Sequence, residues 1–256
     1  MKHLFSKNSR RDFLKTASMG SMLSLGLPGI VTSVMEEEKV KKIPLSKGDI
    51  ILFQGDSITD SGRKKEEAAA NNSSALGKGY AFLAASDLLN KYPEKELQIY
   101  NKGISGNKVF QLAERWDADC FDLKPTVLSI LVGVNDFWHT LSGKYNGTIE
   151  TYRTDYDKLL DRTKQKLPDL KLIIGEPYAV TGVKAVDEKW YPAFNDYRQA
   201  AKELAAKYNA TFIPYQAIYD KAIKSAPGSY WTPDGVHPGV AGAALMAQAW
   251  LETVKG

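Results

Sequence analysis

A serine lies four positions after a short, uninterrupted apolar run. Ile50 to Phe53 is uninterrupted and apolar, which is typical of a strand buried on both faces of a parallel sheet. The run ends at Gln54-Gly55-Asp56-Ser57, where Gly55 permits a sharp turn at the edge at which open α/β sheets bind ligands. Ser57 is therefore expected at the rim of a cleft, either as a nucleophile or as the N-cap of a following helix.

A serine nucleophile needs a base, and histidine usually serves because its pKa lies near neutrality. Besides one histidine near the N-terminus, the chain has His139 and His237. Asp234 precedes His237 by three residues, so its carboxylate can accept the Nδ1–H and turn Nε2 toward Ser57. Asp136 is near His139 at the same spacing, but no glycine lies between them to allow the tight turn that Gly235 allows between Asp234 and His237. We predict His237 as the base and Asp234 as the group that orients it.

An oxyanion would form during attack on an ester and needs hydrogen-bond donors. The N–H of Ser57, the N–H of Gly103 and the side-chain amide of Asn135 follow three different predicted strands. These donors would converge if the three strand ends lie at one edge of the sheet. Asn135 has a second interpretation, as a turn residue that bonds its own backbone.

The same turns allow two other assignments. Trp138 and Trp231 flank two of the motifs and could stack on a sugar ring, with Asp56 beside them as a substrate contact, or the two rings could pack in the core. A metal site is conceivable from Asp56, Asp60, Asp136, Asp234 and His237. With one histidine and no cysteine cluster in that set, we expect no metal and no cofactor.

Strands and helices alternate along the chain. Further strands are predicted at 97–101, 126–132, 170–175 and 211–213, and helices at 79–92, from 108 to about 121, and at 148–167, 190–208 and 239–254. This alternation predicts an α/β fold with a parallel sheet covered on both sides. Right-handed crossovers then bring the polar, glycine-marked turns to one edge of the sheet.

The charge of the chain is concentrated at its beginning. Residues 1–35 carry five basic side chains and one acidic, whereas the remainder carries 29 of each. The body of the protein therefore offers no electrostatic reason to bind nucleic acid or a membrane surface. With 256 residues and the single cysteine Cys120, we expect one domain without an internal disulfide.

The N-terminal segment has the features of an export signal. Ser9-Arg10-Arg11-Asp12-Phe13-Leu14-Lys15 resembles the twin-arginine motif, and a mildly apolar stretch interrupted by glycine and proline follows. We predict an export signal at residues 1–35, a linker at 36–48 and the folded domain at 49–256. The expected location is periplasmic or extracellular, with no stable membrane contact after export.

Four segments resemble, in order, the sequence blocks of the SGNH (GDSL) hydrolases. They are Gly55 to Asp60, Asn101 to Gly106, Gly133 to Asp136 and Asp234 to Pro238. The resemblance implies a three-layer αβα sandwich with a five-stranded parallel sheet, which is a flavodoxin-like arrangement. It also implies Ser57 as nucleophile, His237 as base, Asp234 as the orienting group, and Gly103 with Asn135 in the oxyanion hole.

Over a longer stretch, the sequences of two blocks look most similar to those of the acetyl xylan esterase branch. These are Asn-Lys-Gly-Ile-Ser-Gly-Asn at 101–107 and Gly-Val-Asn-Asp-Phe-Trp at 133–138. The resemblance implies a serine esterase that removes acetyl groups from a plant polysaccharide or oligosaccharide such as xylan. Two alternatives stay open: a lysophospholipase or thioesterase of the same family, and an exported carbohydrate-binding protein with an inert cleft. The sequence leaves open whether the protein forms a homo-oligomer.

Overall fold

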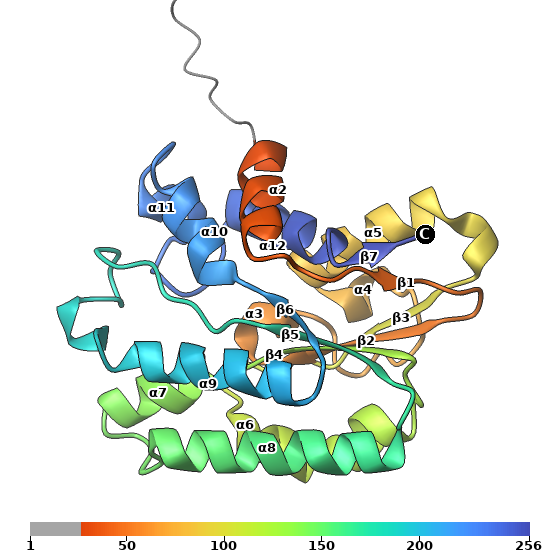
Figure 1. Cartoon of the computed structure of the whole chain (residues 1–256), viewed down its shortest axis with the longest axis horizontal. Coiled ribbons are helices and arrows are strands. Elements are labelled where there is room, and N and C mark those ends of the chain that lie inside the picture. Colours follow the sequence, from red (N-terminus) through yellow and green to blue (C-terminus); the bar gives the residue numbers. More distant parts are fainter. Residues whose placement is uncertain (1–26) are drawn as a thin grey trace, which may run out of the picture.

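The computed structural model describes residues 27–256 as a three-layer αβα sandwich (Figure 1). The central sheet is parallel throughout, with strand order β3-β2-β4-β5-β6. Its strands are β2 (Ile50–Gly55), β3 (Gln98–Asn101), β4 (Val127–Leu131), β5 (Lys171–Gly175) and β6 (Thr211–Ile213). The predicted fold class and the five predicted strands are confirmed, and the carboxyl ends of β2, β3 and β4 meet at one edge.

Helices cover both faces of the sheet (Figure 1). One face carries α6 (Val109–Glu114), α7 (Val134–Leu141), α8 (Ile149–Lys166) and α9 (Phe194–Lys207). The other carries α2 (Leu27–Glu37), α5 (Tyr80–Lys91), α10 (Tyr215–Ala222), α11 (Gly228–Trp231) and α12 (Val240–Leu251). The short helices α3 (Ser57–Asp60) and α4 (Ser73–Leu76) follow β2. No helix among residues 27–256 is long and apolar enough to cross a membrane.

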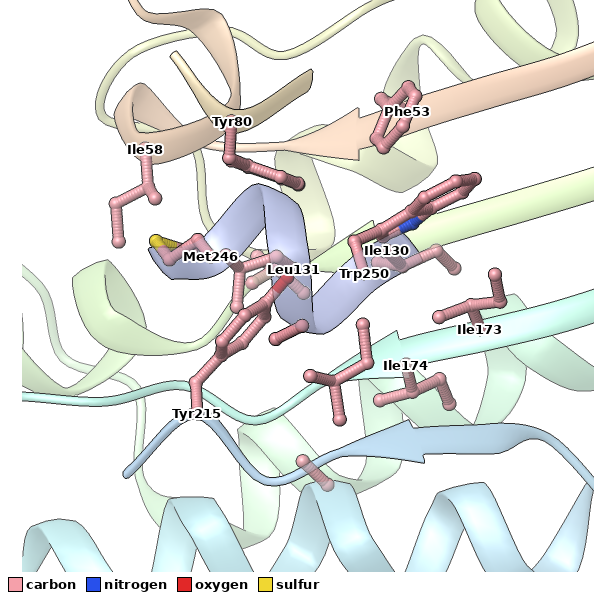
Figure 2. Close-up of a cluster of buried hydrophobic side chains, with 14 of the residues drawn as sticks. Phe53, Ile58, Tyr80, Ile130, Leu131, Ile173, Ile174, Tyr215, Met246 and Trp250 are labelled. Carbon is pink, nitrogen blue, oxygen red and sulfur yellow. The ribbon is translucent and has the colours of Figure 1, made fainter. Parts of the chain in front are cut away.

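The core between α12 and the sheet is rich in large side chains. Figure 2 shows Trp250 and Met246 on α12 lying over residues of the central strands. The ring of Trp250 lies 4.8 Å from that of Phe53, and its Nε1–H donates to Ser129 Oγ at 3.0 Å. Burying one such aromatic side chain contributes roughly 1.5–3 kcal/mol. This packing fixes α12 against the strand that ends at the Ser57 turn.

Two predicted helices differ from the observed ones. The helix expected at 190–208 is preceded by a 3₁₀ turn at Glu188–Trp190 and begins at Phe194. Pro192 disfavours a helical conformation of the residue before it, and Tyr191 is extended, with φ −114° and ψ 144°. The helix expected to reach about residue 121 ends at Glu114 and is followed by a π-helical turn at Asp117–Phe121. Helices α7, α10 and α11 were not predicted.

The segment before the first sheet strand packs on the domain. Val31 and Val34 of α2 are buried against the core, and α2 contacts α10 and α12. Strand β1 (Ile43–Pro44) pairs in parallel with β7 (Val254–Lys255). The residues predicted as the end of the signal and as the linker are thus part of the folded structure. The twin-arginine motif at residues 9–15 lies outside the described residues.

Candidate active site

The turn after β2 positions Ser57. A Cβ at Gly55 would overlap the carbonyl oxygen of Leu131, so only glycine allows the close approach of these two strand ends. The side chain of Asp56 caps α3, because its Oδ1 accepts the N–H of Ile58 at 3.0 Å. As the first residue of this helix, Ser57 has an N–H without an intrahelical acceptor.

The structure brings together Ser57, His237 and Asp234. The last two come from the loop between α11 and α12. Ser57 Oγ lies 2.7 Å from His237 Nε2, and His237 Nδ1 lies 2.7 Å from Asp234 Oδ2. The other carboxylate oxygen, Oδ1, accepts the N–H groups of Val236 and His237 at 2.9 and 2.7 Å. Both oxygens of Asp234 are therefore held, and the ring is held through Asp234.

The charge of Asp234 fixes the tautomer of His237. Partial burial opposes ionisation, but hydrogen bonds from the His237 ring and from two backbone N–H groups outweigh it and lower the pKa of Asp234. The ionised carboxylate can only accept, so Nδ1 carries the proton. The lone pair of Nε2 then faces the hydroxyl of Ser57, which is the state required to remove its proton.

Gly103 differs from its predicted role. Its N–H donates to the side-chain oxygen of Asn101 at 2.9 Å, and its carbonyl accepts from Arg63 Nε at 2.8 Å. A Cβ at Gly103 would overlap the backbone of Thr59 and Asp60, so glycine is needed for the loop to pack against α3. The N–H of Gly103 is thus engaged, and its assignment as an oxyanion donor is corrected.

The same loop contains a free donor three residues later. The N–H groups of residues 102, 103, 104, 105, 107 and 108 each have an acceptor. Among the described residues, the N–H of Gly106 has none. Gly106 has φ +82° and open space around its Cα. Gly106, and not Gly103, is therefore the glycine of this loop whose N–H can donate a hydrogen bond to an oxyanion.

The side chain of Asn135 lies at the start of α7. Its Nδ2 donates one hydrogen to the carbonyl of Asn107 at 3.3 Å, which orients the amide. The second Nδ2–H has no acceptor among residues 27–256. The segments that follow β2, β3 and β4 at one edge of the sheet thus each supply one donor that is free in the described part of the chain: the N–H of Ser57, the N–H of Gly106 and the amide of Asn135.

Two of the predicted substrate contacts are corrected. Asp56 is fully buried and serves as the cap of α3, so it presents no surface to a ligand. Trp231 is 3% exposed and donates its Nε1–H to the carbonyl of Ala226, so it is a core side chain. Trp138 keeps partial exposure and packs on Trp190 at 5.6 Å between ring centroids.

Two buried carboxyl groups lie under the site. Asp56 and Asp136 each have one oxygen, Oδ2, without a hydrogen-bond partner in the described part of the chain. Burial is the main cause that raises the pKa of each to about 7, and the charge of Asp56 adds to the effect on Asp136. Oδ1 of Asp136 accepts the N–H of Val109 at 3.1 Å. The fold therefore favours the protonated form of both groups.

This burial makes stability depend on pH. The contribution of Asp136 is fully present below pH 4 and is lost as the pH rises through about 7, because its folded-state pKa exceeds that of the unfolded chain. Asp136→Asn keeps the acceptor for Val109 and removes the charge. We expect the variant to exceed the wild type in free energy of unfolding at pH 8 by at most about 4 kcal/mol.

Urea unfolding at pH 4, 6 and 8 checks this expectation. The difference between Asp136→Asn and the wild type should grow with pH. The control is Asp169→Asn at an exposed carboxylate, which should show no such growth. A difference of the same size at all three pH values would contradict the argument.

The geometry agrees with comparisons to known proteins. Residues 53–245 match the model of the GDSL-like Lipase/Acylhydrolase family. The chain belongs to this family. It is 32% identical over 212 residues to the acetylxylan esterase of Geobacillus stearothermophilus, covering 82% of this chain and 95% of the relative. The family match and the similarity to this esterase together show that the protein is a carboxylic ester hydrolase.

Solved structures extend the likeness. A protein of Parabacteroides merdae described as a GDSL-like lipase superimposes with a TM-score of 0.81 at 47% identity, covering 83% of this chain and 98% of its own. A mutant of the acetyl-xylooligosaccharide esterase from the Geobacillus species gives a TM-score of 0.74 at 30% identity, covering 84% and 100%.

Catalytic mutants of the Geobacillus esterase replace a serine, an aspartate or a histidine by alanine. Its aspartate and histidine are three positions apart, as Asp234 and His237 are. The separation between its serine and histidine differs from that of Ser57 and His237 by a single position.

Proposed function

We propose that this GDSL hydrolase is a serine esterase that removes acetyl groups from a plant polysaccharide or oligosaccharide such as xylan. The observation that carries the chemistry is the unbroken hydrogen-bond chain from Ser57 through His237 to Asp234, at 2.7 Å for each link. The acetyl-carbohydrate substrate is supported by the likeness to an acetylxylan esterase over 95% of its length.

In the proposed mechanism, Ser57 attacks the acetyl carbonyl while Nε2 of His237 takes its proton. The N–H groups of Ser57 and Gly106 and the amide of Asn135 stabilise the tetrahedral oxyanion. Asp234 stays ionised and holds the imidazolium. His237 then protonates the leaving sugar oxygen, and a water molecule attacks the acyl-enzyme by the same sequence of proton transfers.

Asn135→Ala removes one oxyanion donor. We expect kcat to fall by about 10²–10³-fold with little change in KM, because the lost hydrogen bond forms fully only in the transition state. Steady-state hydrolysis of p-nitrophenyl acetate measures both constants. A loss of less than threefold in kcat would remove Asn135 from the mechanism.

The substrate is tested by acetate release from acetylated xylan, acetylated pectin fragments and simple acetylated sugars. We expect the highest kcat/KM on acetylated xylooligosaccharides, and a strong preference for p-nitrophenyl acetate over the octanoate. A preference for octanoate or for acyl thioesters would favour the lysophospholipase or thioesterase alternative. An inert carbohydrate-binding protein would hydrolyse none of these esters.

The twin-arginine motif supports a further proposal, export of the protein in folded form. The test replaces Arg10 and Arg11 together by lysine and follows the protein by cell fractionation. We expect the wild type outside the cytoplasm and the double variant inside it. Equal distribution of the two would contradict export by this pathway.

A further inference from the structure

A lysine ammonium lies buried beside the candidate active site without a counterion. Lys108, which precedes α6, is 8% exposed, and no carboxylate lies within 4.0 Å of its Nζ in the described part of the chain. Its one hydrogen-bond partner there is Nδ1 of His139, at 3.3 Å. An ammonium has three donors, so two are available. Burying a cation without an anion costs free energy, so we expect the ammonium to bind an anion from outside the chain.

His139 holds the ammonium of Lys108 in place. Since the ammonium can only donate, Nδ1 of His139 accepts and Nε2 carries the proton. Burial, together with the positive charges of Lys108 and Lys144, lowers the pKa of His139, so the ring is neutral. Nε2–H has no acceptor among residues 27–256. The Nδ1 and Nε2 positions point away from each other across the imidazole ring, so the Nε2–H faces away from the ammonium. The two unused donors on Lys108 are therefore the ones that can meet at a single anion.

Two aromatic rings flank the ammonium. The Nζ of Lys108 lies 5.5 Å from the ring centroid of Phe110 and 5.2 Å from that of Tyr145, and the two rings stack at 5.7 Å. Such contacts hold a cation in place without neutralising it. Both rings keep partial exposure. The rings of Phe110 and Tyr145 thus offer apolar surfaces next to the ammonium, and aromatic surfaces of this kind can contact the faces of sugar rings.

This cluster lies one helical turn from an oxyanion donor. Asn135 and His139 are four residues apart on α7, so they share a face with Cβ atoms about 5–6 Å apart. They contact consecutive residues of the facing loop, Asn135 at Asn107 and His139 at Lys108. A substrate whose ester carbonyl reaches Asn135 would therefore extend toward Lys108 within about one sugar unit.

We propose that Lys108, held by His139, binds a carboxylate on the carbohydrate, so that the preferred ester carries a uronic acid next to the acetylated sugar. The ammonium has two unused donors and supplies a charge-assisted hydrogen bond to the carboxylate. This inference rests on the proposed function and adds the substrate class. It assigns Lys108 to binding and His139 to positioning Lys108, outside the bond-breaking steps.

The test compares acetylated xylooligosaccharides with and without a glucuronic acid substituent. In the wild type we expect kcat/KM to be at least about 10-fold higher for the acidic substrate. Lys108→Gln should reduce this ratio by about 10-fold or more, mainly through KM of the acidic substrate. The control, Lys224→Gln, removes one positive charge at an exposed position and should leave the ratio unchanged.

The comparison of the two substrates on the wild-type enzyme tests the carboxylate site even if Lys108→Gln fails to fold. Equal kcat/KM on the two substrates would overturn the carboxylate site and leave the proposed function standing. An unchanged ratio in folded Lys108→Gln would also overturn it. Failure to release acetate from either carbohydrate, with p-nitrophenyl acetate still hydrolysed, would overturn the proposed substrate and the site together.

Discussion

Ser57→Ala is expected to lower kcat for p-nitrophenyl acetate by at least about 10⁴-fold, because the hydroxyl is the only atom that can form the acyl-enzyme in this mechanism. Ser57 Oγ makes the single contact to His237 Nε2, so its removal leaves the link from His237 to Asp234 in place. The fold should be retained, as judged by circular dichroism and Tm.

The matched control is Ser73→Ala. Ser73 lies exposed at the start of α4, one short helix further along the same segment. Its activity should equal that of the wild type. Activity of Ser57→Ala within about tenfold of wild type would mean that another group attacks the ester.

Asp234→Asn is expected to lower kcat by about 10⁴-fold while the protein stays folded. The amide oxygen of asparagine can still accept the N–H groups of Val236 and His237 that Oδ1 now accepts. Its NH₂ group would donate to Nδ1 of His237, which places the ring proton on Nε2, facing Ser57. The ring could then no longer take the serine proton.

Steady-state kinetics at pH 8 measures this loss, with Asp169→Asn as the control for removing one surface carboxylate. We expect the control to match the wild type. A loss of less than about tenfold in Asp234→Asn would show that Asp234 does not set the tautomer, and the hydrogen bond at 2.7 Å would have to be assigned to loop structure alone.

The architecture followed from the sequence because local patterns decided it. The apolar run of β2 and the β-branched run of β4 both favour an extended strand. The helices between the strands are the crossover connections that parallel strands need. Strand order does not follow from these local patterns, since it depends on which strands pair. The packing of α2 against α10 and α12 also depends on tertiary contacts that an apolar leader-like stretch does not reveal.

Sequence motifs located the histidine and the aspartate well, because a spacing of three residues places both in one short loop. They failed at Gly103, where the nearby Gly106 offers the same residue type. A signal was present: Asn side chains commonly accept the N–H two residues later, and Asn101 does so with Gly103. Asp56 and Asp234 bond the N–H two residues on in the same way.

The aromatic and charged surroundings could not be read from the sequence. Trp138 and Trp231 are equally close to motifs, yet only Trp138 keeps partial exposure, because burial depends on which helices pack above each ring. Likewise, Lys108 and His139 are 31 residues apart and meet only because α7 faces the loop before α6.

Mapping the site of covalent modification tests the central claim most directly. The wild-type protein is treated with a fluorophosphonate, which reacts with a serine hydroxyl activated by a base, and is digested for peptide mass spectrometry. The Ser57–His237–Asp234 arrangement predicts a single adduct on the peptide that contains Ser57, together with loss of esterase activity in proportion to labelling. An unlabelled Ser57 in active enzyme, or inactivation through a different residue, would contradict it.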